Sequence, residues 1–256
     1  MIANYHTHTW RCNHASGKEV QYVDAAVQRG LKILGFADHS PYFFSGDYYS
    51  RFRMWPRQLD DYISTILALR EEYRGKIELH VGLELEYYPS YFPKLLDFLR
   101  DRPVEYLLLG QHFIGDEMGE HYSGNPTADE SILRQYCRQT MDAMNTGLFT
   151  YLAHPDLLHF TGSSRVYRHY MRQLCAEANS CGIPVEINLL GLSESRHYPN
   201  GLFWEIAGEE GCQAVLGCDA HSPKALTDTA TEEKALALAG RYGIPVLETV
   251  PLRPIR

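Results

Sequence analysis

The chain alternates short, strongly apolar segments with longer segments in which apolar side chains recur every three or four residues. The short segments have the length and composition of β-strands. They lie at residues 3–8, 33–37, 77–85, 106–111, 150–153, 185–187 and 214–217, with 246–250 as a further candidate. Two longer segments, 57–74 and 165–181, place their apolar residues on one helical face. This alternation predicts an α/β fold with a parallel sheet covered by helices.

Two junctions between a predicted helix and the next apolar segment have nearly the same sequence. They read Cys-Gly-Ile-Pro-Val-Glu at 181–186 and Tyr-Gly-Ile-Pro-Val-Leu-Glu at 242–248. Glycine favours the left-handed end of a helix, and the proline that follows prevents the helix from continuing. We interpret both as the recurring construction of a barrel, not as an internal duplication.

The aromatic segment 42–55 is the most irregular part of the sequence. It directly follows His39, so we predict a loop over the mouth of a site at the strand ends. A plain surface loop with packed aromatic side chains is the alternative.

Composition narrows the class of protein. The 256 residues suffice for one domain, residues 1–256, in the form of a single α/β barrel of about 250 residues. A net charge of -8 without a long basic run disfavours long nucleic acids, although local cations could hold a small anion.

We expect neither a signal peptide nor a membrane span. The six cysteines show no C-x-x-C spacing, which is typical of reduced thiols in a cytoplasmic protein. The oligomeric state stays open.

Seven histidines and two acidic residues lie at or just after the ends of the predicted strands. In chain order they are His6, His8, His14, His39, Glu84, His112, His154, Asp219 and His221. The carboxyl ends of the strands of a parallel barrel converge on one face, so we expect these side chains to lie close together. Imidazole and carboxylate groups are metal ligands, and the sequence therefore predicts a metal site.

Alternation along a strand orients some of these residues but leaves others open. His6 and His8 are two positions apart and can point the same way, as can Asp219 and His221. Glu84 and Glu86 share this relation, so alternation alone does not decide which of them is a ligand. Cys12 is either a further ligand or a bystander thiol. The other histidines lack placement at a strand end and are assigned no metal role: His80, His121, His159, His169 and His197.

Six short motifs carry a family resemblance. They are Tyr-His-Thr-His-Thr at 5–9, Gly-Phe-Ala-Asp-His-Ser-Pro at 35–41, Gly-Leu-Glu at 82–84, Leu-Ala-His with Asp-Leu-Leu-His at 152–159, Glu-Ile-Asn at 186–188 and Asp-Ala-His-Ser-Pro-Lys at 219–224. In content and order they resemble the PHP (polymerase and histidinol phosphatase) superfamily, and its histidinol-phosphatase branch in particular.

The resemblance implies a distorted TIM-like (β/α)7 barrel that holds three metal ions, with zinc, manganese and iron as candidates. It assigns the first ion to His6, His8, Glu84 and Asp219. It makes Glu84 a bridge to the second ion, which His112 and His154 complete, and it assigns the third to His14, His39 and His221. The family's glutamate follows a Gly-x pair, which favours Glu84 over Glu86.

The same resemblance implies a reaction. A bridged metal cluster lowers the pKa of a bound water to about 7, and the resulting hydroxide can attack phosphorus. Glu84, Asp219 and His221 are the expected catalytic residues. Arg165, Arg196 and His197 are expected to bind the substrate phosphate, for which the arginine fork is well suited; exposed loop cations without a role are the alternative. His197, Asp156 and a metal-bound water all remain candidates for the general acid.

We therefore expect a metal-dependent phosphomonoesterase that acts on a small phosphorylated substrate. The leading hypothesis is hydrolysis of L-histidinol phosphate to L-histidinol and phosphate. The alternatives are another small phosphate ester or a short nucleotide, and a metal-binding module without catalytic activity.

Overall fold

A seven-stranded parallel sheet forms the centre of the computed structural model, which describes residues 1–119 and 121–255. Each strand pairs with the next in chain order, as in a barrel. The strands are β1 (Ala3–Asn4), β2 (Ile33–His39), β3 (Glu78–Leu85), β4 (Tyr106–Leu109), β5 (Phe149–Leu152), β6 (Val185–Asn188) and β7 (Ala214–Gly217).

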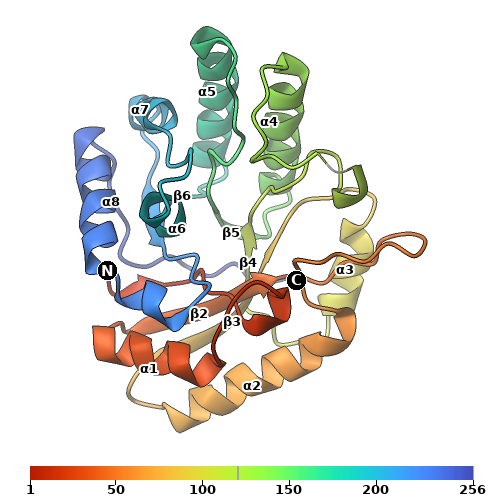
Figure 1. The fold of residues 1–256 in the computed structure, drawn as a ribbon, viewed down its shortest axis with the longest axis vertical. Helices are drawn as coiled ribbons and strands as arrows, with labels where there is room; N and C mark the ends of the chain where they lie inside the picture. The colour runs from red at the N-terminus through yellow and green to blue at the C-terminus, as the bar shows by residue number, and fades with distance from the viewer. Residues whose placement is uncertain (120, 256) are drawn as a thin grey trace.

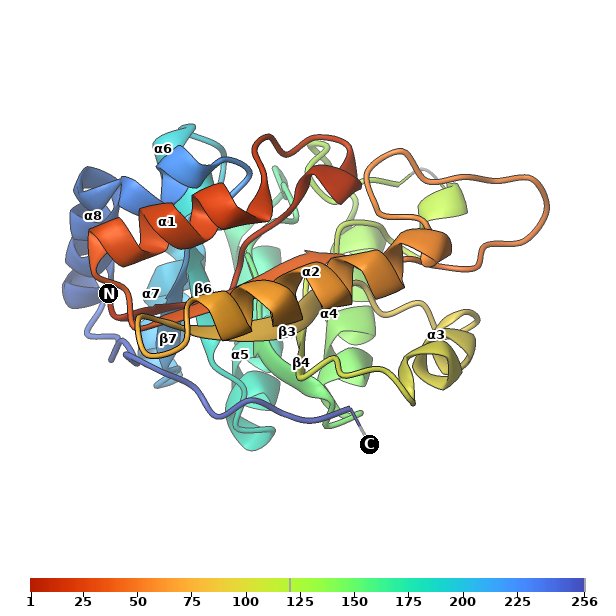
Figure 2. The ribbon, with the colours of Figure 1, turned by 90° about the horizontal axis from the view of Figure 1, so that it is seen from below.

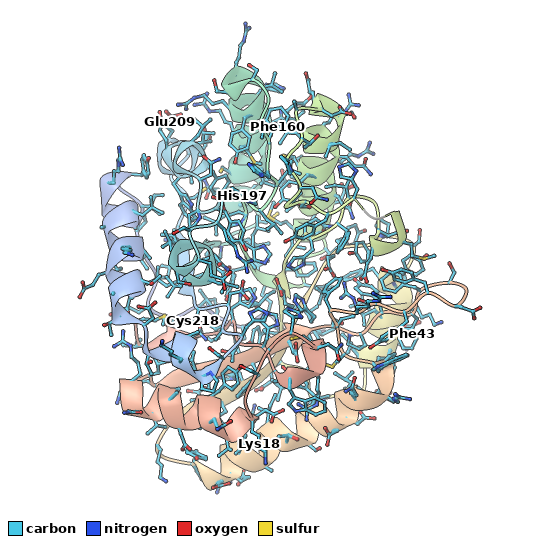
Figure 3. The ribbon with its side chains drawn as sticks, viewed as in Figure 1. Lys18, Phe43, Phe160, His197, Glu209 and Cys218 are labelled. Atoms are coloured by element: carbon cyan, nitrogen blue, oxygen red, sulfur yellow. The ribbon has the colours of Figure 1, made fainter. Side chains whose placement is uncertain are left out.

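Helices surround this sheet (Figure 1). They are α1 (Glu19–Arg29), α2 (Leu59–Glu72), α3 (Phe92–Leu99), α4 (Glu130–Met144), α5 (Ser164–Ser180), α6 (Leu189–Ser193), α7 (Gly201–Glu209) and α8 (Thr229–Arg241). Short 3-10 helices lie at η1 (Trp10–Cys12), η2 (Pro56–Gln58), η3 (Glu117–Gly119) and η4 (Pro223–Thr227). Neighbouring helices also bind one another, since Glu209 of α7 forms ion pairs with Arg168 and Arg172 of α5 (Figure 3).

The barrel is nearly closed between its first and last strands. Thr7, just after β1, forms a parallel bridge with Ala220, just after β7. The His8 amide donates to the Ala220 carbonyl at 3.0 Å, and the Ala220 amide donates to the His6 carbonyl at 3.1 Å. The two bridged residues lie next to four of the predicted ligands, which are His6, His8, Asp219 and His221, so closing the barrel also brings its two ends together at the candidate site. The distorted (β/α)7 barrel expected from the sequence is confirmed.

Alternate residues of β4 belong to two different apolar clusters. Leu107 and Leu109 of β4 pack outward into the large cluster beneath the helices. Tyr106 and Leu108 belong to a second, smaller cluster together with Tyr151 of β5. Because successive side chains of a strand point to opposite faces, the second cluster lies inside the barrel.

Three predicted segments differ most from the structure, and the others agree to within about two residues at each end. The segment 3–8 is regular only at Ala3–Asn4, because the Asn4 side chain turns onto the backbone and bonds the His6 carbonyl and the Cys218 amide. The segment 246–250 is not a strand: Val246 forms a single bridge with Ala214, and Val250 then packs into the inner cluster. The helix predicted at 57–74 divides into η2 and α2.

The segment 42–55 is a long loop without helix or strand, and it extends away from the body of the barrel (Figure 2). Its end is tied down by Arg53, whose side chain is 2% exposed. Arg53 donates to Glu86 at 3.0 Å, to Glu117 at 2.9 Å and to the Ser40 carbonyl at 2.9 Å. The loop thus joins the mouth of the barrel through one buried cation.

None of the helices that the structure describes is long and apolar enough to cross a membrane. All six cysteines are free thiols, five of them buried.

Candidate metal centre

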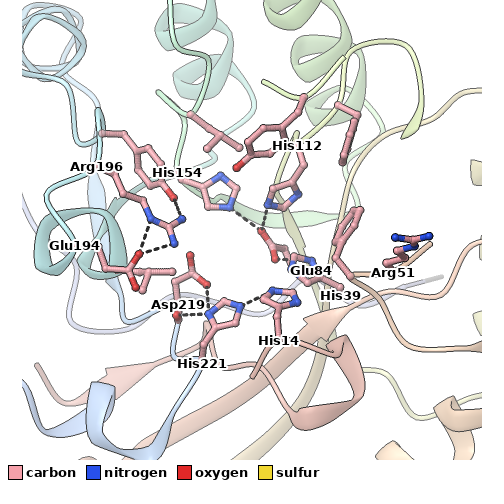
Figure 4. Close-up of a pocket in the computed structure, with 16 residues that line it drawn as sticks. His14, His39, Arg51, Glu84, His112, His154, Glu194, Arg196, Asp219 and His221 are labelled. Atoms are coloured by element: carbon pink, nitrogen blue, oxygen red, sulfur yellow. Dashed lines mark hydrogen bonds and ion pairs between the residues drawn. The ribbon is translucent and has the colours of Figure 1, made fainter. Parts of the chain in front are cut away.

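All nine residues predicted as ligands meet at the carboxyl end of the barrel (Figure 4 shows those that line the cavity). Eight of them fall into groups of three whose nitrogen or oxygen atoms lie within 4.8 Å of one another. The ninth, His112, joins them through Glu84, because its Nε2 lies 3.6 Å from Glu84 Oε1. The five histidines assigned no metal role belong to none of these groups among the described residues.

The deeper part of the cluster is built around two carboxylates. Nε2 of His6 and Nε2 of His8 each lie 3.4 Å from Glu84 Oε2. His8 Nε2 lies 3.1 Å from Asp219 Oδ1. On the other side of Glu84, its Oε1 lies 2.8 Å from His154 Nε2. Glu84 therefore stands between two sets of imidazoles, the position that a bridging ligand requires.

The outer part of the cluster consists of His14, His39 and His221. His14 is exposed, His221 is partly buried and His39 is buried. The Nε2 atoms of His14 and His221 lie 2.9 Å apart, and His39 Nδ1 lies 3.1 Å from Glu84 Oε2. This group faces the opening of the cavity, whereas His6 and His8 are fully buried below it.

A second set of groups fixes the orientation of the imidazoles. His6 Nδ1 bonds Glu186 at 2.7 Å, and His112 Nδ1 bonds Glu86 at 2.9 Å. His8 Nδ1 bonds Asp38 at 3.3 Å. Such bonds fix the tautomer so that the other ring nitrogen is free to bind a metal. They also place Glu86 behind His112 and leave Glu84 in the cluster, a choice that alternation left open.

The pKa values of the residues in the cluster are shifted in different directions. Burial lowers the pKa of His6, but the carboxylates of Glu186, Asp219 and Glu84 outweigh it and raise that pKa well above its usual value. Burial likewise opposes ionisation of Glu84, and His112 and its neighbours nevertheless hold its pKa well below the usual range. Burial, together with His8, lowers the pKa of His221 to about 3. Carboxylates that stay ionised among imidazoles are suited to binding a cation, and a bound metal ion would take the place of the proton that they draw onto His6.

Several buried atoms in the cluster have no hydrogen-bond partner among the described residues. They are Nε2 of His6, Nε2 of His8, Nδ1 of His39, Oε2 of Glu84 and Nδ1 of His154. Three of these nitrogens, on His6, His8 and His39, lie within 3.4 Å of Oε2 of Glu84. A buried polar atom without a partner costs about 1–3 kcal/mol, so these four converging atoms need an occupant. Metal ions fit this donor set.

Two of the predicted ligands have an unusual backbone conformation. His154 has a φ of 29° and Asp219 a φ of 46°. Residues other than glycine adopt such angles at a cost of about 1–3 kcal/mol, and they do so mostly at functional sites. Buried carboxylate and amide groups stabilise both residues: the His154 amide donates to Glu186 at 2.9 Å, and Asn188 Nδ2 donates to Asp219 at 3.1 Å.

The cluster forms the floor of a cavity of about 510 Å³. Phe52 and Phe113 line one side, stacked at 5.6 Å. Arg196 lies on the side of the cavity opposite Arg51 (Figure 4), where it bonds Glu194 and donates to the Tyr198 hydroxyl at 2.8 Å. The cavity thus combines a polar floor, an aromatic wall and a fixed cation.

The structure brings only one of the three residues predicted to bind phosphate into this cavity. Arg196 lines it, but Arg165 is exposed on a separate surface hollow beside Arg168. His197 Nε2 donates to the Leu157 carbonyl at 2.7 Å, and its ring stacks on His159 at 4.2 Å. Neither Arg165 nor His197 is among the residues that line the cavity.

Asp156, a candidate general acid, is also not among the lining residues. It is buried and accepts a hydrogen bond from the Asn200 amide just before α7. Burial raises its pKa to about 7. Its position indicates a structural role in fixing the start of α7.

Sequence reasoning assigned no role to several residues that the structure places at the site. Glu186 and Asp38 lie behind the imidazoles, and Arg51 lines the cavity opposite Arg196. The Glu-Ile-Asn and Ala-Asp-His motifs contain the first two and could have indicated them. Arg51 lies in the irregular loop and has no comparable signal. Cys12 forms one group with His8 and His221, whose potential ligand atoms lie within 4.8 Å of one another.

Comparisons with known proteins agree with this geometry. The family model described as "PHP domain" matches residues 4–189. A probable histidinol-phosphatase of Deinococcus radiodurans is 28% identical over 230 residues, with 87% of each chain covered. The histidinol-phosphatase of Bacillus subtilis is 26% identical over 249 residues, covering 84% of this chain and 92% of its own.

The solved structure of a histidinol phosphate phosphatase from Lactococcus lactis, complexed with zinc, L-histidinol and phosphate, has the same fold. Its TM-score is 0.74 at 20% identity, and the alignment covers 97% of this chain and 96% of the other. Fold and site together define a barrel with an imidazole–carboxylate cluster at its carboxyl end. The family match covers well over half of the chain, and the chain belongs to the PHP family.

Proposed function

We propose that this protein is a metal-dependent phosphomonoesterase that hydrolyses L-histidinol phosphate to L-histidinol and phosphate. The observation that carries the proposal is the set of nine converging ligands with unpartnered buried atoms at its centre. The names of the relatives from Deinococcus and Bacillus, and the ligands of the Lactococcus structure, support this substrate.

The cluster would hold three metal ions. Glu84 would bridge two of them, with His6, His8 and Asp219 on one side and His112 and His154 on the other. His14, His39 and His221 would hold the third. Zinc suits this donor set, as manganese and iron also do. Ions held there supply an activated water and neutralise charge on the phosphoryl oxygens.

The residues of the chain bind and orient the substrate. Arg196 binds the phosphate, and its bonds to Glu194 and Tyr198 fix the guanidinium plane at the cavity wall. Phe52 and Phe113 provide an apolar surface for the imidazole ring of the substrate. Because Arg165 and His197 lie outside the cavity, we do not include them in the phosphate site.

Turnover by the metal-reconstituted protein tests the proposal. We expect kcat/KM for L-histidinol phosphate to exceed that for other small phosphate monoesters and for short nucleotides. If the protein prefers one of those esters, the assignment of L-histidinol phosphate as substrate is wrong, but the assignment of phosphate ester hydrolysis stands. Absence of hydrolysis of every ester by protein with full metal content would favour a non-catalytic metal-binding module.

A further inference from the structure

One acidic residue of the cavity takes no part in the metal cluster. Three acidic residues line the cavity within the described part of the chain: Glu84, Asp219 and Glu194. The first two lie within the cluster of predicted ligands. Glu194 directly follows α6 and stands at the wall beside Arg196 (Figure 4). It is therefore the carboxylate that the metal centre leaves available.

The pair formed by Glu194 and Arg196 has unused bonding capacity. Nε and Nη2 of Arg196 both donate to Oε2 of Glu194, at 2.9 and 2.7 Å. For Oε1 of Glu194, the structure records no partner among the residues it describes. The Arg196 Nη1 group bonds Tyr198. A guanidinium has five N–H donors, so Arg196 keeps donors for an anion while Glu194 keeps an oxygen for a cation.

The substrate of the proposed function carries the complementary charges. L-histidinol phosphate has a phosphate and, separated from the ester oxygen by two carbon atoms, an ammonium group. Its two opposite charges are neighbours, as are the guanidinium of Arg196 and the carboxylate of Glu194. An ammonium needs a hydrogen-bond acceptor when it leaves water, and a carboxylate provides the strongest one.

We propose that Glu194 binds the ammonium group of the substrate through Oε1 while Arg196 binds its phosphate. This inference rests on the proposed function and makes Glu194 the residue that selects amino alcohol phosphates over esters without an amine. The ion pair stays intact during binding, because each partner uses atoms that the pair leaves free. The side chain of Glu194 is 53% exposed, so the amine is recognised at the rim of the cavity.

The test compares two substrates and three proteins. The substrates are L-histidinol phosphate and its deamino analogue, in which hydrogen replaces the ammonium group. The proteins are the wild type, Glu194→Gln and the matched control Glu205→Gln. Glu205 also pairs with an arginine, Arg168, but on the outer face of the barrel. We expect Glu194→Gln to reduce the ratio of kcat/KM for the two substrates by roughly tenfold to a hundredfold, as for a hydrogen bond to a charged group. The control keeps the wild-type ratio.

Calorimetry gives a second measurement that does not depend on turnover. The affinity of the metal-loaded protein for L-histidinol, compared with the deamino alcohol, should fall in Glu194→Gln by a similar factor. Equal losses for both substrates would overturn the inference, because Glu194 would then act only by holding Arg196. A wild type without preference for the amine would overturn it as well. A wild type that hydrolyses neither substrate would instead refute the proposed function itself.

Discussion

The two ends of the barrel interior are built on opposite principles. At the amino end, Tyr5, Tyr106, Tyr151 and Val250 pack into a small apolar cluster. The Tyr106 hydroxyl donates to the Tyr5 carbonyl at 2.6 Å. At the carboxyl end, the interior is filled with imidazoles and carboxylates, five of whose buried atoms have no partner among the described residues. One end is thus satisfied by its own side chains, whereas the other presents a donor set that metal ions would fit.

This difference assigns stability to one layer and chemistry to the other. Active sites of parallel barrels lie at the carboxyl ends of the strands, where the loops can vary without disturbing the sheet. Among the described residues other than glycine, four have a left-handed backbone, and all four lie in segments that follow the carboxyl end of a strand: Asn13, His154, Ser195 and Asp219. Substitutions in the two layers should therefore have different consequences.

The largest expected effect is the loss of activity on replacing Asp219. We expect Asp219→Ala to reduce kcat/KM at least about a thousandfold, because it removes a carboxylate shared by His6 and His8. Asp219→Asn keeps the size of the side chain and tolerates the positive φ, and it should lose activity to a similar extent. Elemental analysis should show a lower metal content in both. Full hydrolysis with reduced stability would instead mean that the cluster has only a structural role.

The opposite pattern is expected for Tyr106 in the packed layer. Its ring fills the space above Gly82, where an added Cβ would lie 2.2 Å from the ring. Tyr106→Ala should reduce the free energy of unfolding by about 3–5 kcal/mol, while the folded fraction keeps its metal and its kcat. Tyr106→Phe removes only the bond to Tyr5 and should cost about 1 kcal/mol. Chemical denaturation measures both. Loss of metal from folded Tyr106→Ala would show that the two layers are coupled.

The carboxyl-end layer could be predicted from the sequence further than the amino-end layer. Its candidate ligands occur in short, recognisable motifs at or near the strand ends, so the nine positions could be named before any contact was known. The inner apolar cluster has no such motif. Val250 reaches it only because the segment after Val246 leaves the sheet, which depends on the register at Ala214 and not on local composition.

Contacts between residues far apart in the sequence also could not be predicted. Arg196 could be named because it follows a strand, but the same argument selected Arg165, which the first turn of α5 places on the outer surface. Glu84 and Glu86 have the same periodicity. The Gly-x pair before Glu84 favours it as the ligand, and in the structure the partners of Glu86, which are His112 and Arg53, place Glu86 behind the cluster. Long-range pairs of this kind follow from the packed fold and leave no pattern in the local sequence.

A smaller effect is expected at Arg53, which links the loop 42–55 to the ligand layer. Its guanidinium bonds Glu86, and Glu86 in turn bonds His112 Nδ1. Burial opposes the charge of Arg53, but Glu86 and Glu117 raise its pKa above the usual value, so the cation persists. Lysine keeps the charge but cannot reproduce the three directed bonds. We expect Arg53→Lys to weaken metal binding about tenfold to a hundredfold, the range typical of groups that orient a ligand.

Competition with a chelator measures this loss, and Arg57→Lys is the matched control because Arg57 is an exposed cation that stacks on Trp55 at 4.9 Å. The ion at His112 should be lost first, since Glu86 orients that ring, whereas His6 and His8 depend on Glu186 and Asp38. Wild-type metal affinity in Arg53→Lys, with a reduced free energy of unfolding, would place Arg53 with the packed layer as a purely structural residue. A selective loss would instead place the end of the loop in the layer that binds metal.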